Sequence, residues 1–258
     1  VPLHSAVRGV NCITAFRLTF QNTGERPMNS IISRTFEDAF FAMKADSKDA
    51  LFFEGGSSRI AQRFLDTPDF KPTAADFPDY DPACWDEISE DCECLRSEIT
   101  SFLVGDNGSI GAQDDSDATV AKKETPLARL KAYARSNWQL TTADIELTHL
   151  CNCRCRFCYL AEYDNYGMSL EELHRLGLAL RKAGVIFTSL TGGELFLRPD
   201  AIVVLSMFAD LNFMLEIKSN GTLLNPRIIS SLAKLPVFDF QISIYDIVDG
   251  QSATTRRA

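Results

Sequence analysis

Four cysteines lie within eight positions of the chain, and three of them have a spacing that suits metal chemistry. The run His149-Leu-Cys-Asn-Cys-Arg-Cys-Arg-Phe-Cys-Tyr places Cys151, Cys155 and Cys158 in the pattern C-x3-C-x2-C. Three thiolates on one loop can bind three irons of a cubane cluster, which needs four ligands. The fourth iron then has no cysteine, and an open coordination position is typical of a catalytic metal site.

A zinc site or a structural iron–sulfur knuckle is the alternative interpretation of these cysteines. Zinc takes four ligands, commonly in two separated pairs, and either Cys153 or His149 could supply a fourth ligand here. No second C-x-x-C pair follows downstream, and its absence favours a cluster with an open iron.

Three predicted strands after the cysteines carry polar groups at or near their carboxyl ends. Thr191-Gly-Gly-Glu ends the second of the four predicted strands, Ser219-Asn ends the third, and Ser243 lies in the fourth. Glycine lets a ligand approach the backbone closely, and sites of α/β proteins collect at the carboxyl ends of strands. Ordinary turn polarity is the alternative for each group taken alone.

Together, the cysteine run and the Gly-Gly-Glu loop resemble the signature of the radical S-adenosylmethionine (SAM) superfamily. The resemblance implies that a 4Fe-4S cluster on the three cysteines chelates SAM and cleaves it reductively. The resulting deoxyadenosyl radical would abstract a hydrogen from the substrate. The resemblance implies SAM-contacting roles, with Glu194 accepting from the ammonium group, for Phe157, Gly192, Gly193, Glu194, Ser219, Asn220 and Ser243.

The elements after residue 140 alternate between strand and helix, which predicts a parallel sheet with helices outside it. We expect four βα units of a partial TIM-type barrel, and a capping box of Ser169 and Glu172 opens the first helix. The predicted strands are 144–147, 185–190, 215–218 and 238–244, and the predicted helices are 169–183, 200–209 and 225–234.

Residues 28–112 are predicted to form a small α+β module. Strands 36–44 and 50–53 make a hairpin, and helices 59–65 and 82–104 follow. This order resembles the winged-helix-like peptide-binding modules of peptide-modifying radical SAM enzymes. The resemblance implies that a leader peptide adds to the hairpin edge as a further strand. An unspecialised accessory domain is the alternative.

The remaining boundaries divide the chain into a poorly patterned stretch 1–27, a linker and lead-in helix 113–139, and the barrel region 140–258. That region has room for about four of the barrel's βα units, at roughly 30 residues each, whereas relatives usually have six. We therefore expect a C-terminally truncated chain. Its last strand would be an exposed edge, with Phe238, Phe240 and Ile242 poorly covered.

Composition limits the classes of partner. The 258 residues carry a net charge of −9, which disfavours a nucleic-acid binder. No apolar run is long enough to cross a bilayer, and no secretory signal is evident. Clustered cysteines of this kind indicate a reducing compartment, so we expect a cytoplasmic protein.

The sequence therefore predicts a radical SAM enzyme that modifies a ribosomally synthesised peptide. Its expected partners are the precursor peptide and an electron donor such as flavodoxin or ferredoxin, without nucleic acid or membrane. Two alternatives stay open: a radical SAM enzyme that acts on a small molecule or a protein, and a catalytically incomplete peptide-binding remnant.

Overall fold

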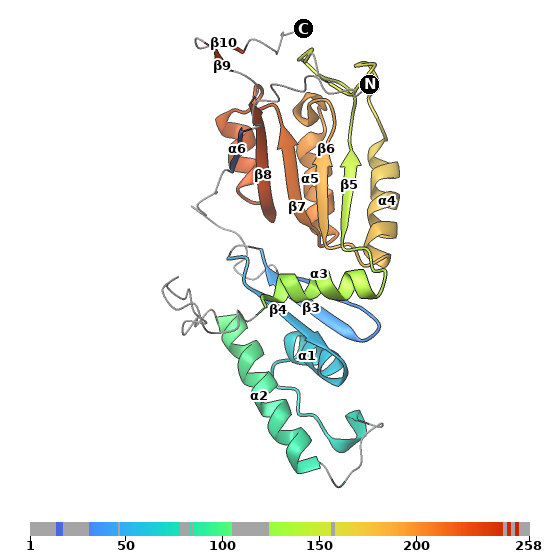
Figure 1. The fold of residues 1–258 in the computed structure, drawn as a ribbon, viewed down its shortest axis with the longest axis vertical. Helices are drawn as coiled ribbons and strands as arrows, with labels where there is room; N and C mark the ends of the chain where they lie inside the picture. The colour runs from blue at the N-terminus through green and yellow to red at the C-terminus, as the bar shows by residue number, and fades with distance from the viewer. Residues whose placement is uncertain are drawn as a thin grey trace, which may run out of the picture. The chain divides into compact units, whose positions relative to one another are not determined.

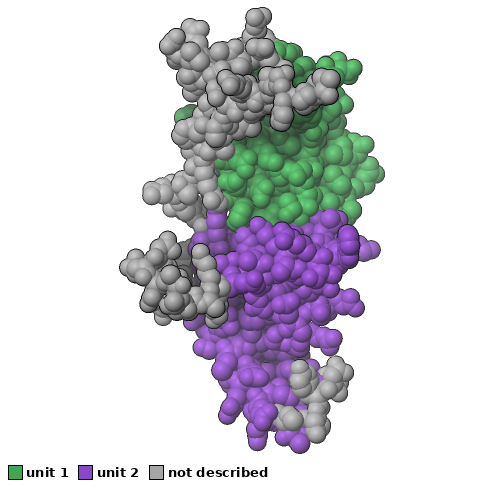
Figure 2. All heavy atoms as spheres, viewed as in Figure 1, with its two compact units in different colours: residues 1–24, 142–180, 187–258 green, residues 25–141, 181–186 purple. Residues whose placement is uncertain are grey.

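The computed structural model describes residues 14–17, 31–45, 47–77, 83, 85–104, 124–155, 158–244, 247–248 and 251–252. The chain divides into two compact units, shown in different colours in Figure 2. Unit 1 comprises residues 1–24, 142–180 and 187–258, and unit 2 comprises residues 25–141 and 181–186. No helix among the described residues is both long and apolar enough to cross a bilayer.

Unit 1 is built on a five-stranded sheet of order β1-β8-β7-β6-β5 (Figure 1). Four strands are parallel neighbours, as predicted: β5 (Thr142–Glu146), β6 (Phe187–Thr191), β7 (Met214–Ser219) and β8 (Val237–Ile244). Three helices alternate with these strands: α4 (Leu170–Lys182), α5 (Ala201–Asp210) and α6 (Pro226–Leu232). The short strands β9 (Ile247–Val248) and β10 (Gln251–Ser252) form a separate antiparallel pair.

The two faces of the sheet differ in polarity. Ile145, Leu190, Ile217 and Phe240 lie side by side in register on one face and are at most 5% exposed. This apolar row belongs to the core, to which α5 adds its buried Phe208. The other face carries a polar row in register, which consists of Asp144, Ser189, Glu216 and Asp239. The alternation of side chains along the strands produces this division, although the β7–β8 pairing shifts register between Leu215 and Glu216.

The prediction that the last strand is an uncovered edge is wrong. β1 (Thr14–Arg17), in the stretch that sequence patterning left unassigned, pairs antiparallel with β8 from Thr14 opposite Ile244 to Arg17 opposite Gln241. Phe240 is fully buried, and Phe238 makes an edge contact with Phe187 at 5.0 Å between ring centroids. The pairing was missed because a four-residue strand shows no period, and its partner lies at the far end of the chain.

Unit 2 contains a three-stranded antiparallel sheet of order β2-β3-β4, formed by β2 (Ile31–Thr35), β3 (Ala39–Lys44) and β4 (Ala50–Glu54). The β3–β4 hairpin was predicted, and β2 is an additional strand. Helices α1 (Gly56–Asp66), α2 (Trp85–Val104) and α3 (Pro126–Ser136) complete the unit, with a one-turn 3-10 helix, η1 (Ala74–Asp76), after α1. Its core includes Phe40, Leu51, Ile60, Phe64, Cys92, Leu95, Ile99 and Phe102.

Candidate functional site

The three predicted cluster ligands lie on one long loop, which follows β5 and precedes α4 in unit 1. Cys151, Cys155 and Cys158 are half-buried, and the amide of Cys158 donates to the carbonyl of Cys155 at 3.1 Å. Cys153 is buried, with 1% of its surface exposed. Phe157 lies outside the described residues.

The thiols interact with one another electrostatically. Burial raises the pKa of the Cys151 thiol, and the charges of Glu194, Cys155 and Cys158 raise it further. The amide of Cys153, which donates to the Cys151 Sγ at 3.4 Å, has the opposite effect on that pKa.

The donor chemistry of the loop fits an iron–sulfur cluster. Among the described residues, no three His, Cys, Asp or Glu side chains already surround one metal position. Three thiols on a single loop are nevertheless the donors that such clusters take. Thiolates bind metal in the deprotonated form, so these cysteines would release protons as iron binds.

The Gly-Gly-Glu loop after β6 is bonded directly to the start of the cysteine loop. The amide of Gly193 donates to the Thr148 carbonyl at 2.8 Å, and the amide of Glu194 donates to the Leu150 carbonyl at 2.7 Å. A Cβ on Gly193 would overlap the carbonyl oxygen of Leu150. Gly192 has a φ of 148°, a conformation that favours glycine. The two loops can therefore lie this close only with glycine at these positions.

Glu194 is fully buried and accepts hydrogen bonds from three residues. Its carboxylate receives the Ser219 hydroxyl at 2.9 and 3.0 Å, the amide of Asn220 at 2.7 Å and the amide of Phe196 at 3.1 Å. Burial raises the pKa of this carboxyl group, and the three donors oppose that effect. The glutamate thus connects the end of β6 to the end of β7.

Asn220 continues these contacts into the cysteine loop. Its Nδ2 donates to the Oδ1 of Asn152 at 2.9 Å, and the Nδ2 of Asn152 donates to the Thr222 hydroxyl at 2.8 Å. The structure therefore brings Gly192, Gly193, Glu194, Ser219 and Asn220 together beside the cysteines, as their positions at strand ends predict. Ser243 is half-buried on β8.

Residues that were not singled out in the sequence anchor the base of the cysteine loop. Arg198 is buried and donates to the carbonyls of Leu147 and Met168, at 2.8 and 2.9 Å, from opposite ends of the loop. Its charge is balanced by Asp200 at 2.9 Å. The only sequence signal for this role is a charged residue that closely follows the Gly-Gly-Glu turn.

His149 contacts a carboxylate rather than the cysteines. Its Nε2 lies 3.3 Å from Glu146, whose other oxygen accepts the Tyr159 hydroxyl at 2.5 Å. Burial is the larger cause and this hydrogen bond the second cause that raise the pKa of Tyr159 to about 12. This contact with Glu146 does not favour His149 as the fourth ligand of a zinc site.

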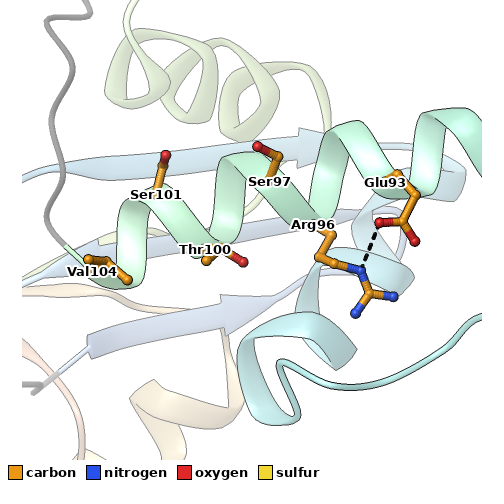
Figure 3. A pocket seen from close by; sticks show the side chains of 6 residues that line it. All are labelled: Glu93, Arg96, Ser97, Thr100, Ser101 and Val104. Carbon is orange, nitrogen blue, oxygen red and sulfur yellow. Dashed lines mark ion pairs between the residues drawn. The ribbon is translucent and has the colours of Figure 1, made fainter.

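Unit 2 has an open hollow on its surface, along one face of α2. Figure 3 shows its lining, in which Glu93 and Arg96 form an ion pair of 3.3 Å. Ser97, Thr100, Ser101 and Val104 complete the lining. Arg96 also donates to the carbonyls of Pro68 and Phe70. Arg96 thus attaches the segment at Pro68 and Phe70 to α2. None of the predicted site residues lines the hollow.

About a third of the chain is similar in sequence to curated proteins. The chain is 37% identical over 83 residues to a probable GTP 3',8-cyclase of Saccharolobus solfataricus, which covers 31% of this chain and 27% of the relative. It is 34% identical over 84 residues to the antilisterial bacteriocin subtilosin biosynthesis protein AlbA of Bacillus subtilis, covering 32% of this chain and 19% of AlbA. The chain therefore matches less than a third of the length of these curated relatives.

The chain also aligns with parts of solved structures. The crystal structure of Streptococcus suis SuiB bound to precursor peptide SuiA aligns with 80% of this chain and 45% of SuiB, with a TM-score of 0.43 and 16% identity. SuiB bound to S-adenosylmethionine aligns over 80% of this chain and 44% of SuiB, with a TM-score of 0.41 and 14% identity. Residues 145–249, which contain the cysteine loop and the Gly-Gly-Glu turn, match the family model of the Radical SAM superfamily.

Proposed function

We propose that the chain takes part in reductive cleavage of SAM, with a 4Fe-4S cluster bound by Cys151, Cys155 and Cys158. The observation that carries the proposal is the direct bonding of the cysteine loop to the Gly-Gly-Glu turn at the carboxyl ends of parallel strands. Ligands of open α/β sheets bind at this edge. Bound cluster and SAM would supply radical chemistry.

The residues of the chain have separable roles in this proposal. The three thiols hold the cluster and leave one iron without a cysteine. Gly192 and Gly193 present backbone without a Cβ, so that SAM can approach closely. Backbone amides and hydroxyl groups nearby would orient the cofactor by hydrogen bonds, and we assign Phe157 to pack against it. In this proposal SAM lies beside the turns and strand ends that carry Gly192, Gly193, Glu194, Ser219, Asn220 and Ser243.

The proposed substrate is a ribosomally synthesised peptide. One relative, AlbA, is named for the biosynthesis of the bacteriocin subtilosin. Among the described residues, β2 and β4 are the outer strands of the unit 2 sheet, and β4 is the outer strand of the β3–β4 hairpin, so we assign its edge to the leader peptide. A peptide strand can pair with such an edge through its backbone groups. We also propose a flavodoxin or ferredoxin as electron donor and a cytoplasmic location.

Anaerobic reconstitution with iron and sulfide tests the proposal. We expect about four irons per chain, and release of 5′-deoxyadenosine from SAM when a strong reductant is added. Stoichiometric zinc without iron uptake would refute it. Iron uptake without any SAM cleavage would instead favour an incomplete peptide-binding remnant.

A small-molecule substrate is a second candidate, since GTP 3',8-cyclases are among the relatives of 34–37% identity. Titration of the reconstituted chain separates the two candidates. A labelled precursor peptide that binds both the reconstituted chain and the isolated segment 28–112 would favour the peptide substrate. Binding of GTP without binding of any precursor would favour the nucleotide.

A further inference from the structure

The side-chain amide of Asn220 has no hydrogen-bonding capacity left for a ligand. Its Nδ2 donates to Asn152 Oδ1 at 2.9 Å and to Cys153 Sγ at 3.5 Å. Its Oδ1 accepts the amide of Thr222 at 3.0 Å and the hydroxyl of Thr222 at 2.7 Å. A primary amide has two donors and two acceptor lone pairs, so all four are used within the protein.

Glu194 and Ser219 are engaged in the same way. The fully buried Glu194 carboxylate accepts from the hydroxyl of Ser219 and from two backbone amides. The Ser219 oxygen in turn accepts the amide of Gly221 at 3.0 Å. The carboxylate has about four acceptor positions and receives three donors, but Glu194 has no exposed surface, so a cofactor ammonium could reach it only if the surrounding residues moved.

These contacts form one continuous chain across three loops. Glu194 stands on the Gly-Gly-Glu turn and holds the backbone of Asn220 at the end of β7. The Asn220 side chain holds Asn152, which lies between the first two cysteines of the motif. Thr222 closes the circuit by accepting from Asn152 and donating to Asn220. In the part of the chain that the structure describes, side-chain hydrogen bonds thus join the cysteine loop to the segment that follows β7.

We propose that Glu194, Asn220 and Asn152 are positioning residues, which fix the cysteine loop in the geometry that accepts the cluster, and that their side chains do not contact SAM. The proposal rests on the proposed function and changes the roles that the sequence assigned to Glu194 and Asn220. Contact with SAM at this edge would then come from backbone groups and from Ser243.

A double-mutant cycle tests the contact between the two asparagines. Asn152→Ala, Asn220→Ala and the double variant are reconstituted anaerobically beside the unsubstituted chain. Iron per chain is measured, together with the SAM dissociation constant per cluster and the change that SAM causes in the electron paramagnetic resonance spectrum of the reduced cluster. Asn225→Ala is the matched control, because it removes an equal side chain that caps α6 through Ile228.

We expect each asparagine variant to load at most half the iron of the unsubstituted chain, and the double variant to load no less than the worse single variant. Loaded clusters should keep their spectroscopic response to SAM, with a dissociation constant within threefold of the original. Asn225→Ala should load iron fully. Glu194→Gln should load more iron than Glu194→Ala, because glutamine keeps an oxygen for the Asn220 amide.

Three outcomes would overturn the proposal. These are full iron loading in both asparagine variants, additive losses in the double variant, and a fully loaded Asn220→Ala or Glu194→Gln chain that binds SAM at least tenfold more weakly. The last result would show a direct contact with SAM. Failure of the unsubstituted chain itself to load iron would refute the proposed function, which distinguishes that failure from these three.

Discussion

The guanidinium of Arg198 donates to the carbonyl of Leu147 at 2.8 Å, and thereby joins the Gly-Gly-Glu turn to the residue at which the cysteine loop begins. The same nitrogen donates to Met168, at the other end of the loop, at 2.9 Å. A buried arginine needs its donors satisfied and its charge balanced, and Asp200 provides the charge. The two ends of the cysteine loop are therefore held together by one side chain, which donates to several acceptors.

Replacing Arg198 by methionine should destabilise unit 1 by about 3 kcal/mol. The substitution leaves the carbonyls of Leu147 and Met168 without the guanidinium donor and leaves the Asp200 charge without its cation. Urea unfolding of the chain measures the loss. Arg175→Met is the control, since Arg175 is exposed and its pair with Glu171 is 3.8 Å long. That control should change the free energy of unfolding by less than about 0.5 kcal/mol. Equal effects of the two substitutions would contradict a special role for Arg198.

Gly167→Ala should also lower the free energy of unfolding, because Gly167 lies against the Leu147 carbonyl that Arg198 binds. Gly167 has a φ of 89°, and a Cβ there would overlap the carbonyl oxygen of Leu147. Backbone strain and the forced displacement together should cost about 3 kcal/mol. Gly55→Ala is the matched control, because Gly55 has a φ of 67° and no atom within 4 Å of the added Cβ. It should cost about 1 kcal/mol from strain alone, as measured by urea titration of both variants.

Alanine at Cys151, Cys155 or Cys158 should abolish cluster formation, whereas Cys153→Ala should keep it. Cys153 is the matched control, since it lies on the same loop and is buried. Iron and acid-labile sulfide per chain, with the brown absorbance of the cluster, provide the measurement. Loss of iron in the Cys153 variant, with retention in one of the others, would assign the ligands differently.

The pair of Arg198 and Asp200 predicts a pH dependence of stability. Hydrogen bonding to Arg198 is the main cause that lowers the pKa of the Asp200 carboxyl in the folded chain. A lowered pKa means that the unfolded chain binds the proton first, so the stabilisation is complete above about pH 4 and is lost as pH falls through the folded value. Urea midpoints of the chain and of Asp200→Asn should therefore differ most near pH 6 and converge toward pH 3. A constant difference across this range would exclude the linkage.

Sequence patterning predicted the elements whose signals are local. The Ser169–Glu172 capping box is present, with the amide of Ser169 donating to Glu172 at 2.9 Å and that of Glu172 donating to Ser169 at 3.3 Å. The apolar stripe of α2 is buried as its spacing of three and four requires. In each case the residues that decide the structure lie within one or two turns of each other.

The long-range contacts of the site could not be predicted in this way. The motif placed Glu194 beside the cysteines, but its burial depends on Ser219 and Asn220, which belong to another strand. Asn152 and Arg198 carry no periodic signal, since each acts through partners far along the chain. Residue type and spacing therefore predicted which groups gather, and only the fold shows which of them bond to one another.

The antiparallel pairing of β1 with β8 has a consequence for synthesis on the ribosome. β1 emerges before unit 2, and its partner emerges only after β5, β6 and β7 have been made. Contacts of such high sequence separation form late and slow folding. Unit 2 can become compact while the backbone groups of β1 are still unpaired. An unpaired strand of this kind is exposed to chaperone binding or to aggregation until β8 has been synthesised.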